Sequence, residues 1–140
     1  MRVILTVFMI TLFFGLYSCE KQEGFLSVKD AGYTPDSVVF KAKLNPEIAE
    51  DANRIKFQKP WQSQGIQGTD GTPPIEYAIS GINTEENGVD LKQFSINRGS
   101  GVIELPYNHT LTAGEYVISL YVSNIWGRME LPSAIRIIIE

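Results

Sequence analysis

The sequence predicts an all-β fold in which seven short strands form two sheets packed face to face. Apolar residues recur with a period of two along the chain, as in strands that bury one face. No segment after residue 19 keeps the 3.6-residue apolar period of a full helix. Gly, Pro, Asn and Asp gather between the alternating segments, where they favour turns because Gly accepts positive φ and Pro fixes φ. A chain of 140 residues has room for one such domain and a targeting segment.

Each predicted strand is a short run with one apolar face. In the first, Phe40 and its neighbours two residues away share a face, with lysines opposite. The last strand is apolar on both faces because Ile138 joins Ile137 and Ile139, which indicates a strand covered by neighbours. We expect a helical turn only near residues 46–53, and a break from Asn124 to Pro132. The predicted strands span residues 37–44, 54–58, 75–80, 94–97, 102–105, 116–123 and 135–140.

Residues 1–18 have the pattern of a secretion signal. A single basic residue, Arg2, precedes an apolar run from Val3 to Phe14. This run is shorter than the roughly 20 residues that a transmembrane helix needs. An ordinary signal peptide, or an N-terminal transmembrane helix, remains an alternative on these residues.

The only cysteine directly follows this segment. Leu16-Tyr17-Ser18-Cys19 resembles the lipobox of bacterial lipoproteins, although Tyr17 is bulkier than usual at its position. The resemblance implies cleavage before Cys19 and attachment of acyl chains to Cys19, where each buried CH₂ contributes about 0.8 kcal/mol of membrane affinity. We therefore expect a lipid anchor in the bacterial outer membrane, with possible exposure on the cell surface. The expected parts are a signal peptide (1–18), the lipidated Cys19 with a flexible tether (19–30) and the sandwich domain (31–140).

Composition excludes several classes of function. The chain has 12 basic and 16 acidic residues, a net charge of −4 that argues against a protein that neutralises nucleic-acid phosphates. One cysteine excludes an internal disulfide, and one histidine leaves little material for histidine-based catalysis or metal binding. We expect no nucleic-acid partner and no cofactor.

The second half of the chain resembles the cadherin-like repeat. The similarity covers about residues 71–140 and includes Tyr77-Ala78-Ile79, then Phe94-Ser95-Ile96, and then Gly101-Val102-Ile103-Glu104-Leu105. The strand from Tyr116 to Val122 and Gly127 continue the resemblance. It implies an Ig-like or cadherin-like Greek-key sandwich. Independently of the resemblance, the alternation places Phe94 and Ile96 inward, and we expect the Tyr116 hydroxyl to bond to a nearby backbone group.

The calcium ligands of cadherins are not matched. The stretch Leu111-Thr112-Ala113-Gly114 has no acid where a calcium-binding cadherin carries several. Calcium takes six to eight oxygen ligands, and the scattered acids of this chain show no such spacing. We expect the scaffold without a metal.

Two tryptophans are candidates for glycan binding because an indole can stack on a sugar ring. Trp126 lies in an expected hairpin tip with Asn124 and Arg128, whose polar groups suit sugar hydroxyls. Trp61 follows Pro60 ahead of a Gly-rich connection. In the alternative interpretation each indole caps one end of the sandwich.

Catalytic signals are weak. His109 lies in a turn, where we expect it to be exposed rather than to act as a base. No serine occurs in Gly-x-Ser-x-Gly. Paired carboxylates, as in glycosidases, stay open as an enzymatic alternative. The residues favour a lipid-anchored, non-enzymatic binding module for glycans, with an adhesion or structural protein-interaction module as the alternative.

Overall fold

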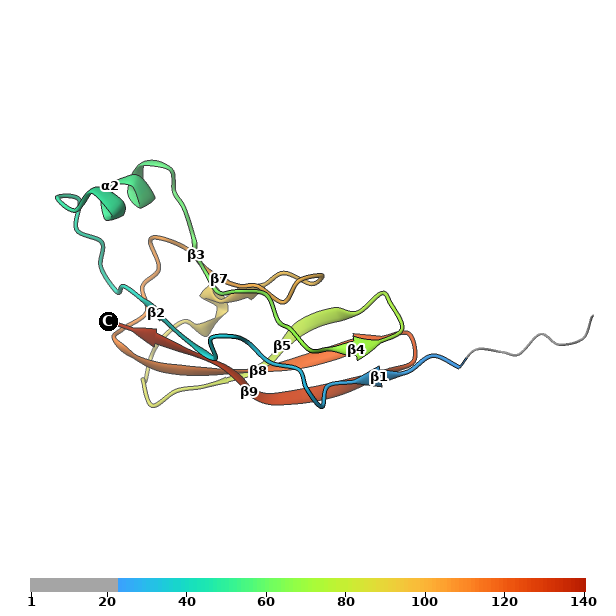
Figure 1. Ribbon diagram of the computed structural model, residues 1–140. Helices are drawn as coiled ribbons and strands as arrows, with labels where there is room; N and C mark the ends of the chain where they lie inside the picture. Colours follow the sequence, from blue (N-terminus) through green and yellow to red (C-terminus); the bar gives the residue numbers. More distant parts are fainter. Residues whose placement is uncertain (1–22) are drawn as a thin grey trace, which may run out of the picture.

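The computed structural model describes residues 23–140, and these are mostly β (Figure 1). The all-β prediction is confirmed, but nine strands in three sheets are present where seven strands in two sheets were predicted. The strands are β1 (Leu26–Ser27), β2 (Ser37–Phe40), β3 (Trp61–Gln62), β4 (Asp70–Gly71), β5 (Glu76–Asn83), β6 (Ser95–Ile96), β7 (Ile103–Leu105), β8 (Gly114–Asn124) and β9 (Gly127–Ile139). A helix, α2 (Ala49–Lys56), and a 3₁₀ turn, η1 (Leu91–Gln93), complete the described elements.

The largest sheet has the order β2-β9-β8-β5. The long antiparallel hairpin of β8 and β9 forms its centre, and β2 lies parallel to β9 with Phe40 opposite Ile139. The covered position predicted for the last strand is confirmed, because β9 has a neighbour on each side. A second sheet has the order β3-β7-β6, and β1 pairs with β4 in a small third sheet.

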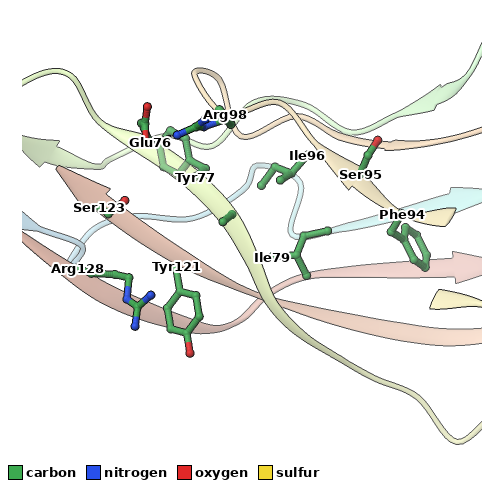
Figure 2. Close-up of a pocket in the computed structure, with 11 residues that line it drawn as sticks. Glu76, Tyr77, Ile79, Phe94, Ser95, Ile96, Arg98, Tyr121, Ser123 and Arg128 are labelled. Carbon is green, nitrogen blue, oxygen red and sulfur yellow. Dashed lines mark hydrogen bonds and ion pairs between the residues drawn. The ribbon is translucent and has the colours of Figure 1, made fainter. Parts of the chain in front are cut away.

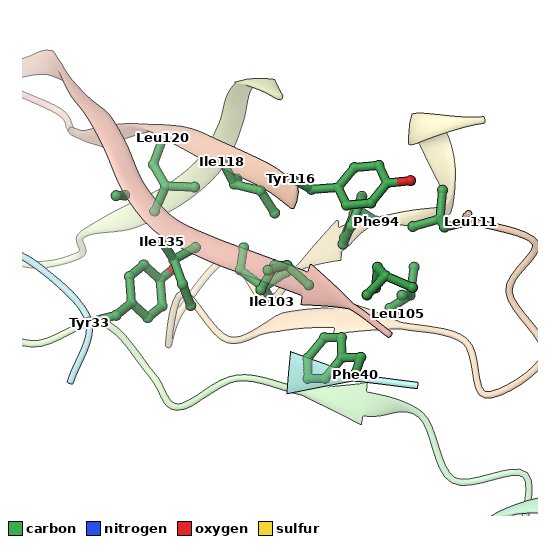
Figure 3. Close-up of a cluster of buried hydrophobic side chains, with 13 residues drawn as sticks. Tyr33, Phe40, Phe94, Ile103, Leu105, Leu111, Tyr116, Ile118, Leu120 and Ile135 are labelled. Carbon is green, nitrogen blue, oxygen red and sulfur yellow. The ribbon is translucent and has the colours of Figure 1, made fainter. Parts of the chain in front are cut away.

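One hydrophobic core joins the two larger sheets (Figure 3). It includes Ile103 and Leu105 of β7, and Tyr116 and Ile118 of β8, all with no exposed surface. Burying each such side chain contributes about 1.5–3 kcal/mol. Phe94 is buried and Ile96 packs on the core, so their predicted inward orientation is confirmed.

Tyr116 fixes the entrance of β8, as the sequence predicted. Its hydroxyl donates a hydrogen bond of 2.9 Å to the carbonyl oxygen of Thr112, four residues upstream. Its ring packs at 54° on that of Phe94, with 5.7 Å between the centroids. This bond from a buried tyrosine to the backbone four residues upstream has the geometry of a tyrosine corner.

The predicted strand at 54–58 is wrong, because residues 49–56 form α2. Five alternating residues are too few to separate a strand from the end of a helix. The order of charges in this segment suits a helix, with Glu50 and Asp51 in the first turn and Arg54 and Lys56 in the last. The helical segment expected near 46–53 is therefore displaced by three residues toward the C-terminus.

The predicted break between Asn124 and Pro132 is also wrong, because β9 begins at Gly127. The pairing of β8 with β9 shifts register between Ile118 and Leu120. Ser133 has a positive φ of 49° at the corresponding part of β9. This irregularity accommodates Pro132, which has no N–H for a regular ladder.

The ordered domain begins before the boundary predicted at residue 31. Leu26 and Ser27, expected within the flexible tether, pair with Gly71 and Asp70 of β4. Cys19 and the signal segment 1–18 lie outside the described residues. Within residues 23–140, no helix has the length and apolar character required to cross a membrane.

Candidate ligand-binding groove

A shallow groove of about 430 Å³ runs along β5, the edge strand of the largest sheet (Figure 2). Its apolar wall comes from Ile79 of β5 and from Phe94 and Ile96 beside it. The volume falls in the range of roughly 300–1,000 Å³ typical of small-ligand sites. Its polar and aromatic lining comes from Glu76, Ser95, Arg98, Tyr121, Ser123 and Arg128.

The strand register brings the groove's polar side chains together. Tyr121 and Ser123 alternate with the buried Leu120 and Val122, so they lie on the outer face of β8. Ser123 is opposite Arg128 of β9 on one side and Glu76 of β5 on the other. Three adjacent strands therefore supply one continuous polar surface.

Arg128 lies against an aromatic ring. Its guanidinium carbon is 4.3 Å from the centroid of Tyr121, and Figure 2 shows the two side chains side by side. A cation over an aromatic face at an exposed position is worth about 0.5–1 kcal/mol. The contact holds five N–H donors next to a flat apolar ring, which is a suitable combination for a polar ligand with an apolar face.

An ion pair also lines the groove. The guanidinium of Arg98 lies 2.6 Å from the Glu76 carboxylate, and both side chains are largely exposed. Such a surface pair contributes about 0–1 kcal/mol to stability. The backbone is fixed more firmly, because the Tyr77 N–H donates to the carbonyl oxygen of Arg98 at 2.9 Å. This backbone bond fixes the position of the ion pair along the groove.

Of the four predicted glycan-binding residues, Arg128 lines this groove and the other three do not. Trp126 is half exposed at the turn between β8 and β9. One part of its indole lies on Gly24, where an added Cβ would come within 1.9 Å of the indole nitrogen. Trp126 therefore belongs to the hairpin tip beside the N-terminal segment.

The Asn124 side chain is occupied by the backbone. Its amide nitrogen donates to the carbonyl oxygens of Phe25 (2.8 Å) and Thr72 (3.0 Å). Its oxygen accepts from the N–H groups of Trp126 (2.9 Å) and Gly127 (3.1 Å). These bonds hold the turn and attach β1 to it, so Asn124 has a structural role in this geometry.

The ring of Trp61 contacts an aromatic and a cationic neighbour. Phe40 stacks on it with 5.4 Å between ring centroids and an interplanar angle of 24°. The Arg54 guanidinium carbon lies 3.7 Å from the ring centroid. The ring is engaged by these two neighbours, so the geometry favours the alternative in which Trp61 packs against the sandwich.

His109 is buried, and the expectation of an exposed turn residue is wrong. The Leu111 N–H donates to Nδ1 at 3.2 Å, so Nε2 carries the proton and donates to the Lys41 carbonyl oxygen at 2.9 Å. Burial lowers the pKa of His109, although the bond to Lys41 opposes this effect. Both ring nitrogens are used to hold backbone, which leaves no free nitrogen for a base.

One buried carboxylate was not singled out by the sequence. Asp51 of α2 accepts two bonds from the Lys41 ammonium, at 2.8 and 2.9 Å, and one from the Asn45 N–H at 2.9 Å. The bond from Lys41 and then that from Asn45 hold the pKa of Asp51 below its usual value. These bonds attach α2 to the chain after β2, which gives Asp51 a structural role in this geometry.

Carboxylates also line a second cavity of about 410 Å³, formed in part by Glu85, Glu86 and Glu115. Glu115 is paired with Arg136 at 2.9 Å, and Glu86 accepts a bond from the Thr112 hydroxyl at 3.3 Å. In the part of the chain that the structure describes, no group of three or more His, Cys, Asp and Glu side chains is arranged to hold a metal ion.

The groove residues other than Arg128 were missed by sequence reasoning. Tyr121 and Ser123 were identified as the outer face of a strand, and Arg128 as a tip residue. Only the register of the hairpin places them next to one another. The chain matches no protein-family model, no characterised protein and no solved structure.

Proposed function

We propose that this chain is a lipid-anchored, non-enzymatic binding module of the bacterial outer membrane that holds a glycan in the groove along β5. The observation that carries the proposal is the pairing of Tyr121 with Arg128, on a surface that also offers Glu76 and Arg98. Sugars present apolar ring faces and pairs of hydroxyls. A flat ring beside guanidinium and carboxylate groups matches both features.

Anchoring belongs to the same proposal. The lipobox-like sequence ends at Cys19, and the described domain starts only a few residues later. We also propose that the domain is an Ig-like or cadherin-like sandwich. The tyrosine corner at Tyr116 and the long β8–β9 hairpin support this assignment.

The test is a glycan screen with the full-length chain purified from a Gram-negative host. Tyr121→Ala and Arg128→Ala are expected to weaken binding about tenfold or more, which corresponds to about 1.4 kcal/mol. Arg136→Ala is the matched control, because Arg136 is also exposed on β9 but lies outside the groove. Equal loss in the control, or unchanged binding in both groove variants, would refute the groove as the glycan site.

A second candidate is a protein-interaction module. The exposed apolar side chains of Ile48, Ile55 and Phe57, at 46%, 37% and 69% exposure, lie on and around α2. Such a patch is typical of protein contacts. An envelope protein that co-purifies with the wild-type chain but not with Phe57→Ser, in the absence of any glycan binding, would favour this function.

A further inference from the structure

Three exposed apolar residues gather at the turn end of the β8–β9 hairpin. Ile125 and Trp126 form the two-residue turn and are 77% and 52% exposed, and Phe25 is 53% exposed. We call these three residues the tip patch. Exposed apolar groups that lie together mark an interaction surface more often than single ones do.

The tip patch is built as a unit. The Asn124 amide donates to the Phe25 carbonyl oxygen, and the Phe25 N–H donates to the Thr72 hydroxyl at 3.1 Å. Gly24 lies against the Trp126 indole. Figure 1 shows β1 alongside the turn that joins β8 to β9. These bonds present the apolar side chains outward from a fixed backbone.

The chain outside the described residues meets the domain at this same end. Cys19 lies five residues before Gly24 in the sequence. Five extended residues span at most about 17 Å. Acyl chains on Cys19 would thus hold the tip patch close to the bilayer surface, a step that rests on the proposed lipid anchor.

We propose that the tip patch inserts into the headgroup region of the membrane to which Cys19 is attached, so that the domain stands on its hairpin end. Trp prefers this region because its indole has an apolar body and a polar N–H. The opposite end would then point away from the membrane, since Trp61 packs on Phe40, whose partner is Ile139 at the far end of β9. Gly127 and Ile139 are 12 residues apart, or about 40 Å at 3.3 Å per residue.

Charge does not explain the attachment. Cleavage before Cys19 would remove Arg2 and leave 11 basic and 16 acidic residues, a net charge of −5 that anionic lipids repel. Insertion of apolar side chains depends little on salt, whereas electrostatic binding weakens as salt screens it. We therefore expect the tip patch to stay inserted in the membrane at high ionic strength.

The test uses the full chain, purified with its acyl chains and reconstituted into phosphatidylethanolamine–phosphatidylglycerol vesicles with brominated acyl chains. In Trp61→Phe, Trp126 is the sole tryptophan and is expected to lose at least half of its emission relative to vesicles without bromine. In Trp126→Phe, the remaining Trp61 is expected to show no such loss, because it lies at the opposite end of β9. Raising the salt concentration is expected to leave both results unchanged.

A second pair of variants covers the case in which Trp61→Phe fails to fold. Ile125→Cys and Phe57→Cys each place a thiol at an exposed position, one in the tip patch and one after α2. An environment-sensitive dye at position 125 is expected to shift to the blue on vesicles. The same dye at position 57 is expected to keep its emission in water.

The outcomes separate this inference from the proposed function. Intact mass shows whether Cys19 carries acyl chains. If the chain is acylated but Trp126 is not quenched and the dye at position 125 does not shift, membrane insertion of the tip patch is overturned while the lipid anchor is supported. A chain without acyl chains refutes the lipid anchor. In that case, brominated vesicles that still quench Trp126 support membrane insertion of the tip patch, and vesicles that do not quench it overturn insertion. If the emission of Trp126 changes with an oligosaccharide but not with vesicles, the tip patch binds a glycan, and membrane insertion is overturned.

Discussion

Single buried or half-buried polar side chains fix the backbone at several points of this domain. Tyr116, His109 and Asn124 each bond to main-chain groups. Asp51 joins a backbone N–H to the Lys41 ammonium. Buried polar atoms need such partners because an unpaired one costs about 1–3 kcal/mol. Their use in holding the fold explains why the sequence offered few convincing catalytic residues.

Tyr116→Phe is expected to lower the free energy of unfolding by about 1 kcal/mol, because it removes the hydroxyl that bonds to Thr112 and keeps the ring on Phe94. Urea denaturation measures the change. Tyr107→Phe is the control, since the Tyr107 side chain is partly exposed and lies outside the tyrosine corner. A loss of similar size in both variants would contradict a specific role of the corner.

At the scale of elements, the sequence predicted best where strands are long and have one buried face. Residues 116–123 alternate without interruption, and β8 contains all of them. Two-residue strands such as β1, β3 and β4 were missed because their pairing partners, rather than a local pattern, define them. The helix α2 was partly misassigned as a strand because five alternating residues do not separate the two. The ion pair of Asp51 with Lys41, which attaches α2 to the chain after β2, is a contact between segments that periodicity does not reveal.

For the candidate site, too, the sequence predicted the residue types but not the contacts between distant segments. Aromatic and charged residues of the right types could be found in the sequence, and Arg128 does line the groove. The pairing of Arg128 with Tyr121 depends on hairpin register, and the contacts of Trp61 with Phe40 and Arg54 depend on how other segments pack on it. Neither feature can be predicted from a short stretch of sequence.

His109 joins two connecting segments, since its Nε2 bonds to the Lys41 carbonyl oxygen across the core from the β7–β8 connection. Lys43 and Glu140 line the cavity beside it. Burial lowers its pKa below the ordinary value of 6.5, so the unfolded chain binds the proton more readily. Stability is therefore expected to be full above about pH 6.5 and to fall as the pH drops below it.

His109→Gln tests this pH dependence, because Gln can still donate to Lys41 but does not titrate. Urea midpoints at about pH 7.5 and about pH 5.5 should differ less in the variant than in the wild type. Asp51, whose pKa is lowered, titrates below this window. An equal fall in both proteins would assign the effect to other groups.

At the scale of the whole molecule, one core connects β2, β7, β8 and β9, so the two larger sheets should unfold together. In the Trp126→Phe background, the fluorescence of Trp61 reports on β3, whose partner is Leu105 of β7. Far-UV circular dichroism reports on all strands. We expect the two urea transitions to coincide, as in a two-state domain.

Leu105→Ala tests this coupling, because Leu105 is fully buried. Its truncation is expected to cost about 2–5 kcal/mol through lost burial and the cavity left behind. Both probes should shift to lower urea by the same amount, since the core is shared. Ile125→Ala, at the exposed turn, should change stability by less than about 0.5 kcal/mol. A Trp61 transition that moves while circular dichroism stays in place would show that the β3-β7-β6 sheet unfolds independently.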